Sequence, residues 1–255
     1  MIALSVNLNK IALIRNSRDT TNPDIPQHAK MCIDAGANGI TVHPRPDQRH
    51  IRVRDCYDLA GMLDVEFNIE GNPTTDARVS DRDGVEDYPG FMALVKELRP
   101  TQCTLVPDGD GQLTSDHGFD LRRDGERIAP LVQELKSLGI RTSLFMDPDP
   151  EQIRLAAQIG TDRIELYTET YARACQYNEE VDSIFQQFVL AAEVALEEGL
   201  AINAGHDLDL NNLPRFATVP GLQEVSIGHA LTVDAIRMGL ASAVTAYQRA
   251  LGNAL

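Results

Sequence analysis

Short apolar runs rich in β-branched residues recur along the chain, and longer amphipathic stretches separate them. Runs of this length and composition predict buried β-strands, and the stretches between them have the spacing of helices that bury one face. Eight runs follow one another without a break, at residues 3–7, 39–43, 65–70, 102–106, 140–146, 163–168, 200–204 and 223–227. The pattern therefore predicts strands and helices in regular alternation.

Glycines mark the ends of several amphipathic stretches. Gly36, Gly139, Gly160 and Gly199 each stand where a helix needs a left-handed residue before the chain turns into a strand. Residues 147–151, Asp-Pro-Asp-Pro-Glu, provide the cap, the first-turn proline and the acid of a helix start. These signals predict repeated βα units.

Eight βα units predict an α/β fold with a parallel sheet closed into a TIM (β/α)8 barrel. We expect residues 1–255 to form one catalytic barrel domain, a usual size for this fold. An open dinucleotide-binding sheet is disfavoured, because no GxGxxG sequence follows the first run. Residues 71–90 and 107–126 are longer than a minimal connection. We expect 107–126 to be a lid, with a solvated insertion as the alternative.

Residues that can move a proton or hold a charged ligand close six of the predicted strands. They are Asn7, His43, Glu70, Glu165, His206 and His229. The carboxyl ends of barrel strands converge on one mouth, so these residues are expected to share one pocket. A carboxyl group among apolar core residues loses hydration, which brings its pKa toward neutrality and suits proton transfer. For the two glutamates, a buried structural ion pair is the alternative.

Two segments predict anion binding at the same mouth. Four arginines lie within residues 45–54, directly after the second predicted strand. The arginine fork suits phosphate oxygens, and His50 adds a donor, although surface or subunit ion pairs are the alternative. Glycine precedes histidine at residues 205–206 and 228–229, at the strand ends where barrels frequently hold phosphate against backbone N–H groups. We therefore expect two separate anion sites.

Metal ligands are not expected, because the chain has no HxH or HExxH pair and arginines near the mouth oppose a divalent cation. Metal-free acid/base chemistry is the better interpretation. The four cysteines have neither zinc nor redox spacing, and we expect them to be buried or incidental thiols: Cys32, Cys56, Cys103 and Cys175.

The net charge of −15 opposes binding to nucleic acid or anionic membranes. Apolar runs all fall well short of the roughly 18 to 20 residues that span a bilayer, and the amino terminus leads directly into a strand pattern. We therefore expect a cytoplasmic protein without nucleic-acid or membrane partners.

Motifs along nearly the whole chain resemble, in order, the pyridoxine 5′-phosphate synthase family. They are SVNLNKIALIRNSR (5–18), AGANGITVHPRPDQRHI (35–51), FNIE (67–70), LVP (105–107) followed by Thr114, SLFMDPDPEQI (143–153), RIELYT (163–168), INAGHDL (202–208) and VSIGHAL (225–231). The resemblance implies a TIM barrel with extra helices, assembled as a homo-octamer. It also implies a cofactor-free condensation of two small phosphorylated ketones, 3-amino-2-oxopropyl phosphate and 1-deoxy-D-xylulose 5-phosphate, in vitamin B6 biosynthesis.

The resemblance also implies roles for individual residues. His43 and Glu70 are implied proton acceptors, His206 a proton donor, and Glu165 a group that stabilises developing positive charge. The implied contacts are Asn7, Arg18, Gly228 and His229 for the aminoketone phosphate, and Arg45, His50 and Thr114 for the deoxyxylulose phosphate.

Two departures from the family pattern involve three residues. Asn9 and Lys10 stand where an acid and a histidine are common, and we expect both to contact substrate. Lys10 keeps a cationic donor but cannot titrate as histidine does near neutral pH. Asp207 replaces the usual glycine after His206 and is not predicted to be a site residue.

Two other functions remain open at this point, because a barrel does not dictate its reaction. One is a metal-dependent sugar-phosphate isomerase or epimerase, whose activity would vanish with the metal. The other is a non-catalytic phosphometabolite-binding protein, which would bind both ketone phosphates without turnover.

Overall fold

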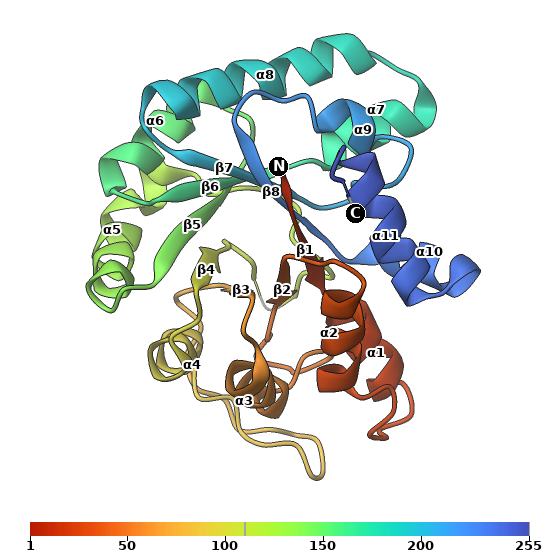
Figure 1. Cartoon of the computed structure of the whole chain (residues 1–255). Coiled ribbons are helices and arrows are strands. Elements are labelled where there is room, and N and C mark those ends of the chain that lie inside the picture. The colour runs from red at the N-terminus through yellow and green to blue at the C-terminus, as the bar shows by residue number, and fades with distance from the viewer. Residues whose placement is uncertain (110, 255) are drawn as a thin grey trace.

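Eight parallel strands pair in chain order, and the last pairs with the first to close a barrel (Figure 1). The computed structural model describes residues 1–109 and 111–254. The strands are β1 (Ala3–Asn7), β2 (Gly39–Val42), β3 (Glu66–Gly71), β4 (Gln102–Leu105), β5 (Arg141–Met146), β6 (Arg163–Tyr167), β7 (Ala201–Gly205) and β8 (Leu222–Ile227). Every predicted run overlaps its strand with ends that differ by at most one residue. The predicted TIM barrel is confirmed.

Eleven helices in the described residues surround the barrel (Figure 1). They are α1 (Asn9–Asn16), α2 (Ile25–Asp34), α3 (Val53–Met62), α4 (Phe91–Leu98), α5 (Leu121–Ser137), α6 (Pro150–Ile159), α7 (Glu169–Tyr177), α8 (Val181–Glu197), α9 (Leu213–Phe216), α10 (His229–Met238) and α11 (Leu240–Ala250). Two helices instead of one follow β1, β6 and β8. These are the extra helices that the family resemblance implies.

Helix ends behave as the local sequence predicts. Gly36, Gly139, Gly160 and Gly199 have φ angles between 76° and 104°, a region that costs glycine little because it lacks Cβ. Asp149 caps α6 by accepting a hydrogen bond from the Glu151 N–H at 2.8 Å. The sequence thus determines where these units turn.

The predicted loop 107–126 is shorter than expected. Its last six residues belong to α5, which begins at Leu121 and buries Leu121, Ile128 and Val132 at helical spacing. The loop therefore ends at Asp120, and Asp110 within it lies outside the described residues. Near its end the loop packs closely against the backbone that follows β5. A Cβ atom at Gly118 would lie 2.2 Å from the backbone nitrogen of Asp147, so only glycine fits there. Whether the loop moves as a lid stays a prediction.

The barrel interior is lined by polar side chains, whereas apolar ones fill the space between strands and helices. Hydrogen bonds join Ser5 to Thr41 at 2.7 Å and Thr104 to Asn68 at 3.2 Å. Thr104 also donates to Glu165 at 3.3 Å, from β4 to β6 across β5, so this bond runs inside the barrel. The polar layer forms the floor beneath the mouth and gives a buried carboxyl group hydrogen-bond partners.

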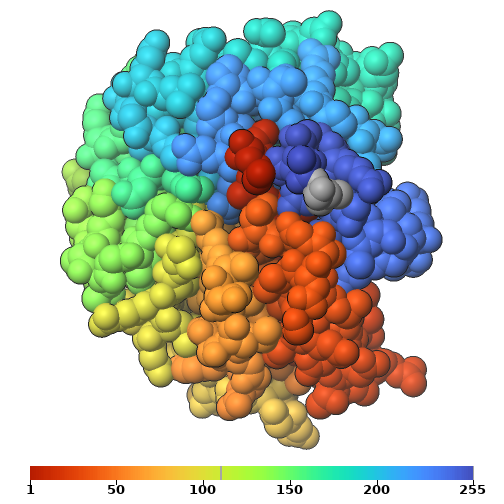
Figure 2. All heavy atoms as spheres, in the orientation of Figure 1, coloured from red at the N-terminus to blue at the C-terminus, as the bar shows by residue number. Residues whose placement is uncertain are grey.

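The amino and carboxyl ends of the chain lie together on the face seen in Figure 2, where the first residues (red) lie beside the last helices (blue). Asn253 donates to the carbonyl oxygen of Ile2 at 2.8 Å. Over the described residues, no helix has the length and apolar character needed to cross a membrane. All four cysteines are free, and three of them are buried.

Candidate active site

A pocket of about 300 Å³ opens at the carboxyl ends of the strands. Twelve of the thirteen predicted site residues line it: Asn7, Asn9, Lys10, His43, Arg45, His50, Glu70, Thr114, Glu165, His206, Gly228 and His229. They come from both halves of the chain, and the closed barrel brings them together. The expected convergence on one mouth is therefore confirmed, while the roles of the residues stay predictions.

Arg18 is the predicted site residue that does not line the pocket. It lies exposed in the turn after α1. Its neighbour in sequence, Asp19, pairs instead with Arg52 at 2.8 Å and with Arg82. The structure therefore does not bring Arg18 together with the other residues, and its phosphate contact remains a prediction.

His43 lies between two carboxyl groups at the end of β2. Its Nδ1 is 4.0 Å from Oε2 of Glu70, and its Nε2 is 3.7 Å from Oδ2 of Asp108. Burial, followed by the nearby positive charge of Arg45, lowers the pKa of His43 well below its usual value. At neutral pH the imidazole is therefore uncharged and can accept a proton.

Glu70 is 8% exposed and is the last residue but one of β3, beside His43. Burial raises the pKa of Glu70 well above its usual range, and the charges of Glu165 and Asp108 act in the same direction. Asn7 donates to its Oε2 at 3.4 Å. A carboxyl group of this kind holds a proton near neutral pH and can exchange it, as general acid/base catalysis requires.

Glu165 faces the pocket from β6 and is 3% exposed. Burial raises its pKa to about 7, although the hydrogen bond from Thr104 and the charge of His206 oppose the shift. The structure does not show the ion-pair alternative for this residue within the described chain, since the hydrogen-bond partner of its carboxyl group is the neutral Thr104 hydroxyl. With a pKa near 7, Glu165 can gain or lose its proton when the charge of a bound group in the pocket changes.

His206 follows β7 and reaches the pocket through a backbone with a positive φ of 87°. Its Nε2 is 2.9 Å from the hydroxyl oxygen of Thr114 in the loop after β4. Its Nδ1 is 2.7 Å from Oδ2 of Asp207. Asp207, which sequence reasoning left out, therefore lines the pocket and bonds directly to a predicted catalytic residue.

Arg45 does not point freely into the pocket. Its guanidinium pairs with Asp108 and donates to the carbonyl oxygen of Gln112 at 2.9 Å. Ser115 donates to the same carboxylate at 3.0 Å, while Oδ1 of Asp108 has no hydrogen-bond partner in the described residues. Burial raises the pKa of Asp108, and the charge of Arg45 opposes the shift. Arg45 thus ties the end of β2 to the loop after β4.

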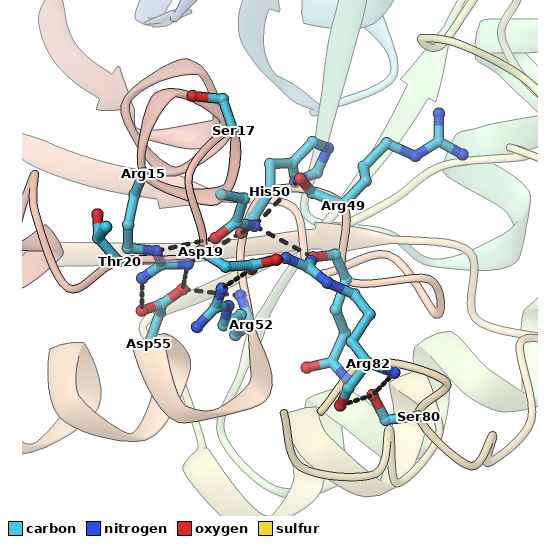
Figure 3. A network of polar contacts seen from close by, with 12 residues as sticks. Arg15, Ser17, Asp19, Thr20, Arg49, His50, Arg52, Asp55, Ser80 and Arg82 are labelled. Atoms are coloured by element: carbon cyan, nitrogen blue, oxygen red, sulfur yellow. Dashed lines mark hydrogen bonds and ion pairs between the residues drawn. The ribbon is translucent and has the colours of Figure 1, made fainter. Parts of the chain in front are cut away.

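His50 lines the pocket from a segment held by a buried ion pair (Figure 3). Arg15 bonds both carboxylate oxygens of Asp55, at 2.5 and 2.9 Å, and donates to the carbonyl oxygen of His50 at 3.1 Å. Burial lowers the pKa of His50 to about 3. Because Nδ1 of His50 accepts from the Ile51 N–H at 2.9 Å, the neutral ring carries its hydrogen on Nε2, where it can donate to an anion.

The remaining arginines of the 45–54 cluster make ion pairs. Arg49 pairs with Asp47 at 2.6 Å, and Arg54 pairs with Asp58 at 2.9 Å on α3. Together with Arg45–Asp108 and Arg52–Asp19, these pairs mean that all four arginines of the cluster are ion-paired. Arg45 is the one of the four that lines the pocket described above.

A further side of the pocket is formed by the starts of two helices, which follow β1 and β8. Asn9 and Lys10 begin α1, and His229 begins α10. Helix starts present unpaired N–H groups and favour anions. Gly228 lets the chain approach closely, since a Cβ atom there would lie 3.1 Å from Cβ of Asn7. This side suits a second phosphate, away from Arg45.

Within residues 1–109 and 111–254, no group of three or more His, Cys, Asp or Glu side chains is placed to hold a metal ion. The chelator experiment below tests metal dependence directly.

Sequence reasoning missed Asp108 and did not select Asp207. Both lie just beyond the end of a predicted strand, where a charged residue also suits a solvated loop. The position of Asp108 two residues after the fourth run was the available signal. Its pairing with Arg45, 63 positions away, appears only in three dimensions.

The fold and the pocket define a class of protein, a (β/α)8-barrel enzyme whose mouth combines proton-transfer groups with anion-binding groups. The family model described as "Pyridoxal phosphate biosynthesis protein PdxJ" matches residues 4–253. The chain belongs to this family.

Named relatives agree with the family match. A protein of Xanthomonas campestris pv. campestris (strain B100), named "Pyridoxine 5'-phosphate synthase", is 54% identical over 248 residues, which cover 96% of this chain and 94% of that protein. One of the same name from Xylella fastidiosa is 50% identical and covers 96% and 92%. A solved tryptophan synthase α-subunit from Pyrococcus furiosus has a TM-score of 0.60 at 11% identity, covers 98% and 97%, and shares the fold alone.

Proposed function

We propose that this chain is a pyridoxine 5′-phosphate synthase. It condenses 3-amino-2-oxopropyl phosphate with 1-deoxy-D-xylulose 5-phosphate and releases pyridoxine 5′-phosphate, phosphate and water. The name of its relatives supports this reaction. Both substrates are phosphorylated ketones, so the site must hold two anions and move protons between them. Residues 1–255 would serve this reaction as one catalytic domain.

The observation that carries the proposal is that one pocket contains both proton-transfer groups and two sets of anion-binding groups. His43, Glu70 and Glu165 line the same pocket as Arg45 and the start of α10. Each of the three has a pKa displaced by burial toward its uncharged form. Ring closure needs protons to be withdrawn and delivered. Each group that transfers a proton accelerates such a reaction by roughly 10²- to 10⁴-fold.

His43 and Glu70 are assigned as the proton acceptors. Amine attack on a ketone requires the ammonium group of the aminoketone to lose a proton first. Neutral His43 can take it, and the positive charge of the ammonium would favour ionised Glu70, so that this carboxylate accepts protons in later steps. At their 4.0 Å separation, one bridging water can pass a proton between them.

His206 is assigned as the proton donor, because its Nε2 faces the pocket and its Nδ1 faces a carboxylate. Glu165 is assigned as the stabiliser of positive charge. Since its pKa is about 7, a cationic intermediate above it would favour the ionised form and be stabilised by it. A neutral intermediate gains much less, so the stabilisation is selective.

The two substrate phosphates are assigned to two different sets of pocket residues. Arg45, His50 and Thr114 would hold the deoxyxylulose phosphate. Asn7, Gly228 and His229 would hold the aminoketone phosphate, with Asn9 and Lys10 as further contacts. Arg18 keeps its assignment to the aminoketone phosphate as a prediction that its position outside the pocket does not support.

A turnover assay tests the proposal. Chelator-treated and untreated protein are mixed with both ketone phosphates, and pyridoxine 5′-phosphate is followed by absorbance. Equal product formation in both samples supports the proposal. Activity lost with the metal would instead indicate a metal-dependent enzyme, and binding without product would indicate a phosphometabolite-binding protein.

Assembly as a homo-octamer in the cytoplasm belongs to the same proposal. Exposed apolar side chains on α1 and α10, Leu13, Ile14 and Ile236, support an interface between copies. Analytical ultracentrifugation tests the assembly, and an octameric mass is expected. A monomer at micromolar concentration would contradict it.

A further inference from the structure

We propose that Asp207 is a positioning residue for His206. It holds a hydrogen of the imidazole on Nδ1, so that Nε2 is the ring nitrogen that faces substrate. This inference rests on the proposed function, in which His206 is the proton donor. Asp207 is not among the site residues that the family resemblance implies.

The geometry is that of a carboxylate–imidazole pair. Oδ2 of Asp207 is 2.7 Å from Nδ1 of His206, the distance of a charge-assisted hydrogen bond. The other ring nitrogen, Nε2, is 2.9 Å from the Thr114 hydroxyl in the pocket. The edge of the ring packs against Tyr167, with centroids 5.1 Å apart and planes at 77°. Contacts on three sides therefore fix the ring.

The charge of Asp207 decides the position of the hydrogen. The hydrogen bond to His206 lowers the pKa of Asp207, so its carboxylate is ionised at neutral pH and can only accept. Nδ1 must therefore carry a hydrogen. Neutral His206 then has its lone pair on Nε2, and protonated His206 has a transferable proton there. Both states present the reactive nitrogen to the pocket.

The backbone is shaped to place these two side chains together. His206 and Asp207 have φ angles of 87° and 57°, a region that is uncommon for residues other than glycine. Thr168 donates to the carbonyl oxygens of Gly205, at 2.9 Å, and of His206. Asn212 donates to the carbonyl oxygen of Asp207 at 3.2 Å. These bonds hold a conformation that would otherwise be unfavourable.

Other charges act on the pair from neighbouring elements. Glu165 on β6 interacts electrostatically with His206, and Lys10 on α1 and His229 on α10 interact favourably with Asp207. Asp207 makes the direct hydrogen bond to the ring, so removing its charge should affect His206 most.

The backbone at position 207 also allows variants that keep the fold. Asp207→Gly and Asp207→Asn both suit a φ of 57°, so the fold should be retained. Asp209→Asn is the matched control. It removes a charge two positions away but keeps the side-chain oxygen that caps the Asn211 and Asn212 N–H groups.

Two readouts are needed. The first is the tautomer of His206, read from long-range ¹H–¹⁵N NMR of the full chain labelled with ¹⁵N-histidine and assigned by comparison with His206→Gln. The second is kcat and KM for the condensation across pH. We expect Asp207→Gly to shift the neutral ring toward Nε2–H. We also expect kcat to fall roughly 10- to 100-fold with little change in KM, the loss typical when a carboxylate that orients a histidine is removed.

The change of tautomer and the loss of kcat should occur together in Asp207→Gly. Asp207→Asn should lie between wild type and Asp207→Gly, and Asp209→Asn should match wild type. An unchanged tautomer in Asp207→Gly overturns the inference, and so does a changed tautomer with unchanged kcat. If the wild type forms no product, the proposed function fails, while NMR still decides whether Asp207 positions His206.

Discussion

Gly205 lies so close to Glu165 that a Cβ atom at position 205 would be 2.5 Å from Oε1 of the carboxyl group. The two residues lie on the paired strands β7 and β6. The glycine that precedes His206 therefore makes room for a predicted catalytic carboxyl group. A residue with any side chain would displace Glu165 or the strand.

The first prediction concerns this contact. Gly205→Ala should reduce turnover and lower the free energy of unfolding by about 1–3 kcal/mol, the usual cost of overpacking. Urea unfolding and kcat measure the two effects. Gly61→Ala on α3 is the control, since no atom lies within 4 Å of its Cβ position, and it should stabilise the helix by up to about 1 kcal/mol. A fully active, equally stable Gly205→Ala would contradict the packing argument.

The second prediction concerns how the ionisation of Glu165 makes the free energy of unfolding depend on pH. Folding raises its pKa from 4.5 to about 7, so the folded protein binds this proton more tightly than the unfolded chain. The fold is therefore destabilised as pH rises between these values. Glu165→Gln, relative to wild type, should become steadily more stable from pH 4.5 to 8 in urea unfolding. Glu126→Gln, an exposed change on α5, should show no such trend, and a flat difference for Glu165→Gln would refute the burial effect.

The third prediction concerns the proton acceptors. His43→Asn and Glu70→Gln keep much of the shape of each side chain but remove its proton-transfer group. Turnover should fall roughly 10²- to 10⁴-fold while KM changes far less, because these groups act mainly in the transition state. Steady-state kinetics with both substrates provide the measurement. Losses confined to KM would mean that the two residues bind substrate and do not catalyse.

The fourth prediction separates binding from stability at Arg45. Arg45→Ala leaves buried Asp108 without its cation, which should cost about 3–5 kcal/mol of unfolding free energy. It should also weaken deoxyxylulose phosphate binding roughly 10- to 100-fold through the lost charged hydrogen bonds. Adding Asp108→Asn should restore much of the stability but not the affinity. Calorimetric titration measures the affinity, and urea unfolding measures the stability. Recovered affinity in the double variant would place that phosphate elsewhere.

The strands could be predicted closely from the sequence, because each is a short apolar run rich in β-branched residues and helix-ending glycines precede four of them. His43, Glu70 and His206 could be predicted as pocket residues for a related reason, since barrel topology fixes where strand ends meet. Asp108 was missed because it acts through Arg45, which is distant in the chain. The start of α5 at Leu121 was missed because its first turn is rich in charged residues.

The most direct test of the central claim is a crystal structure of Glu70→Gln soaked with both ketone phosphates. One phosphate should lie against Arg45, His50 and Thr114, and the other against Gly228 and His229. The two carbonyl carbons should lie between them, within reach of His43 and His206. Phosphates bound outside this mouth, or both on the same side of it, would contradict the account.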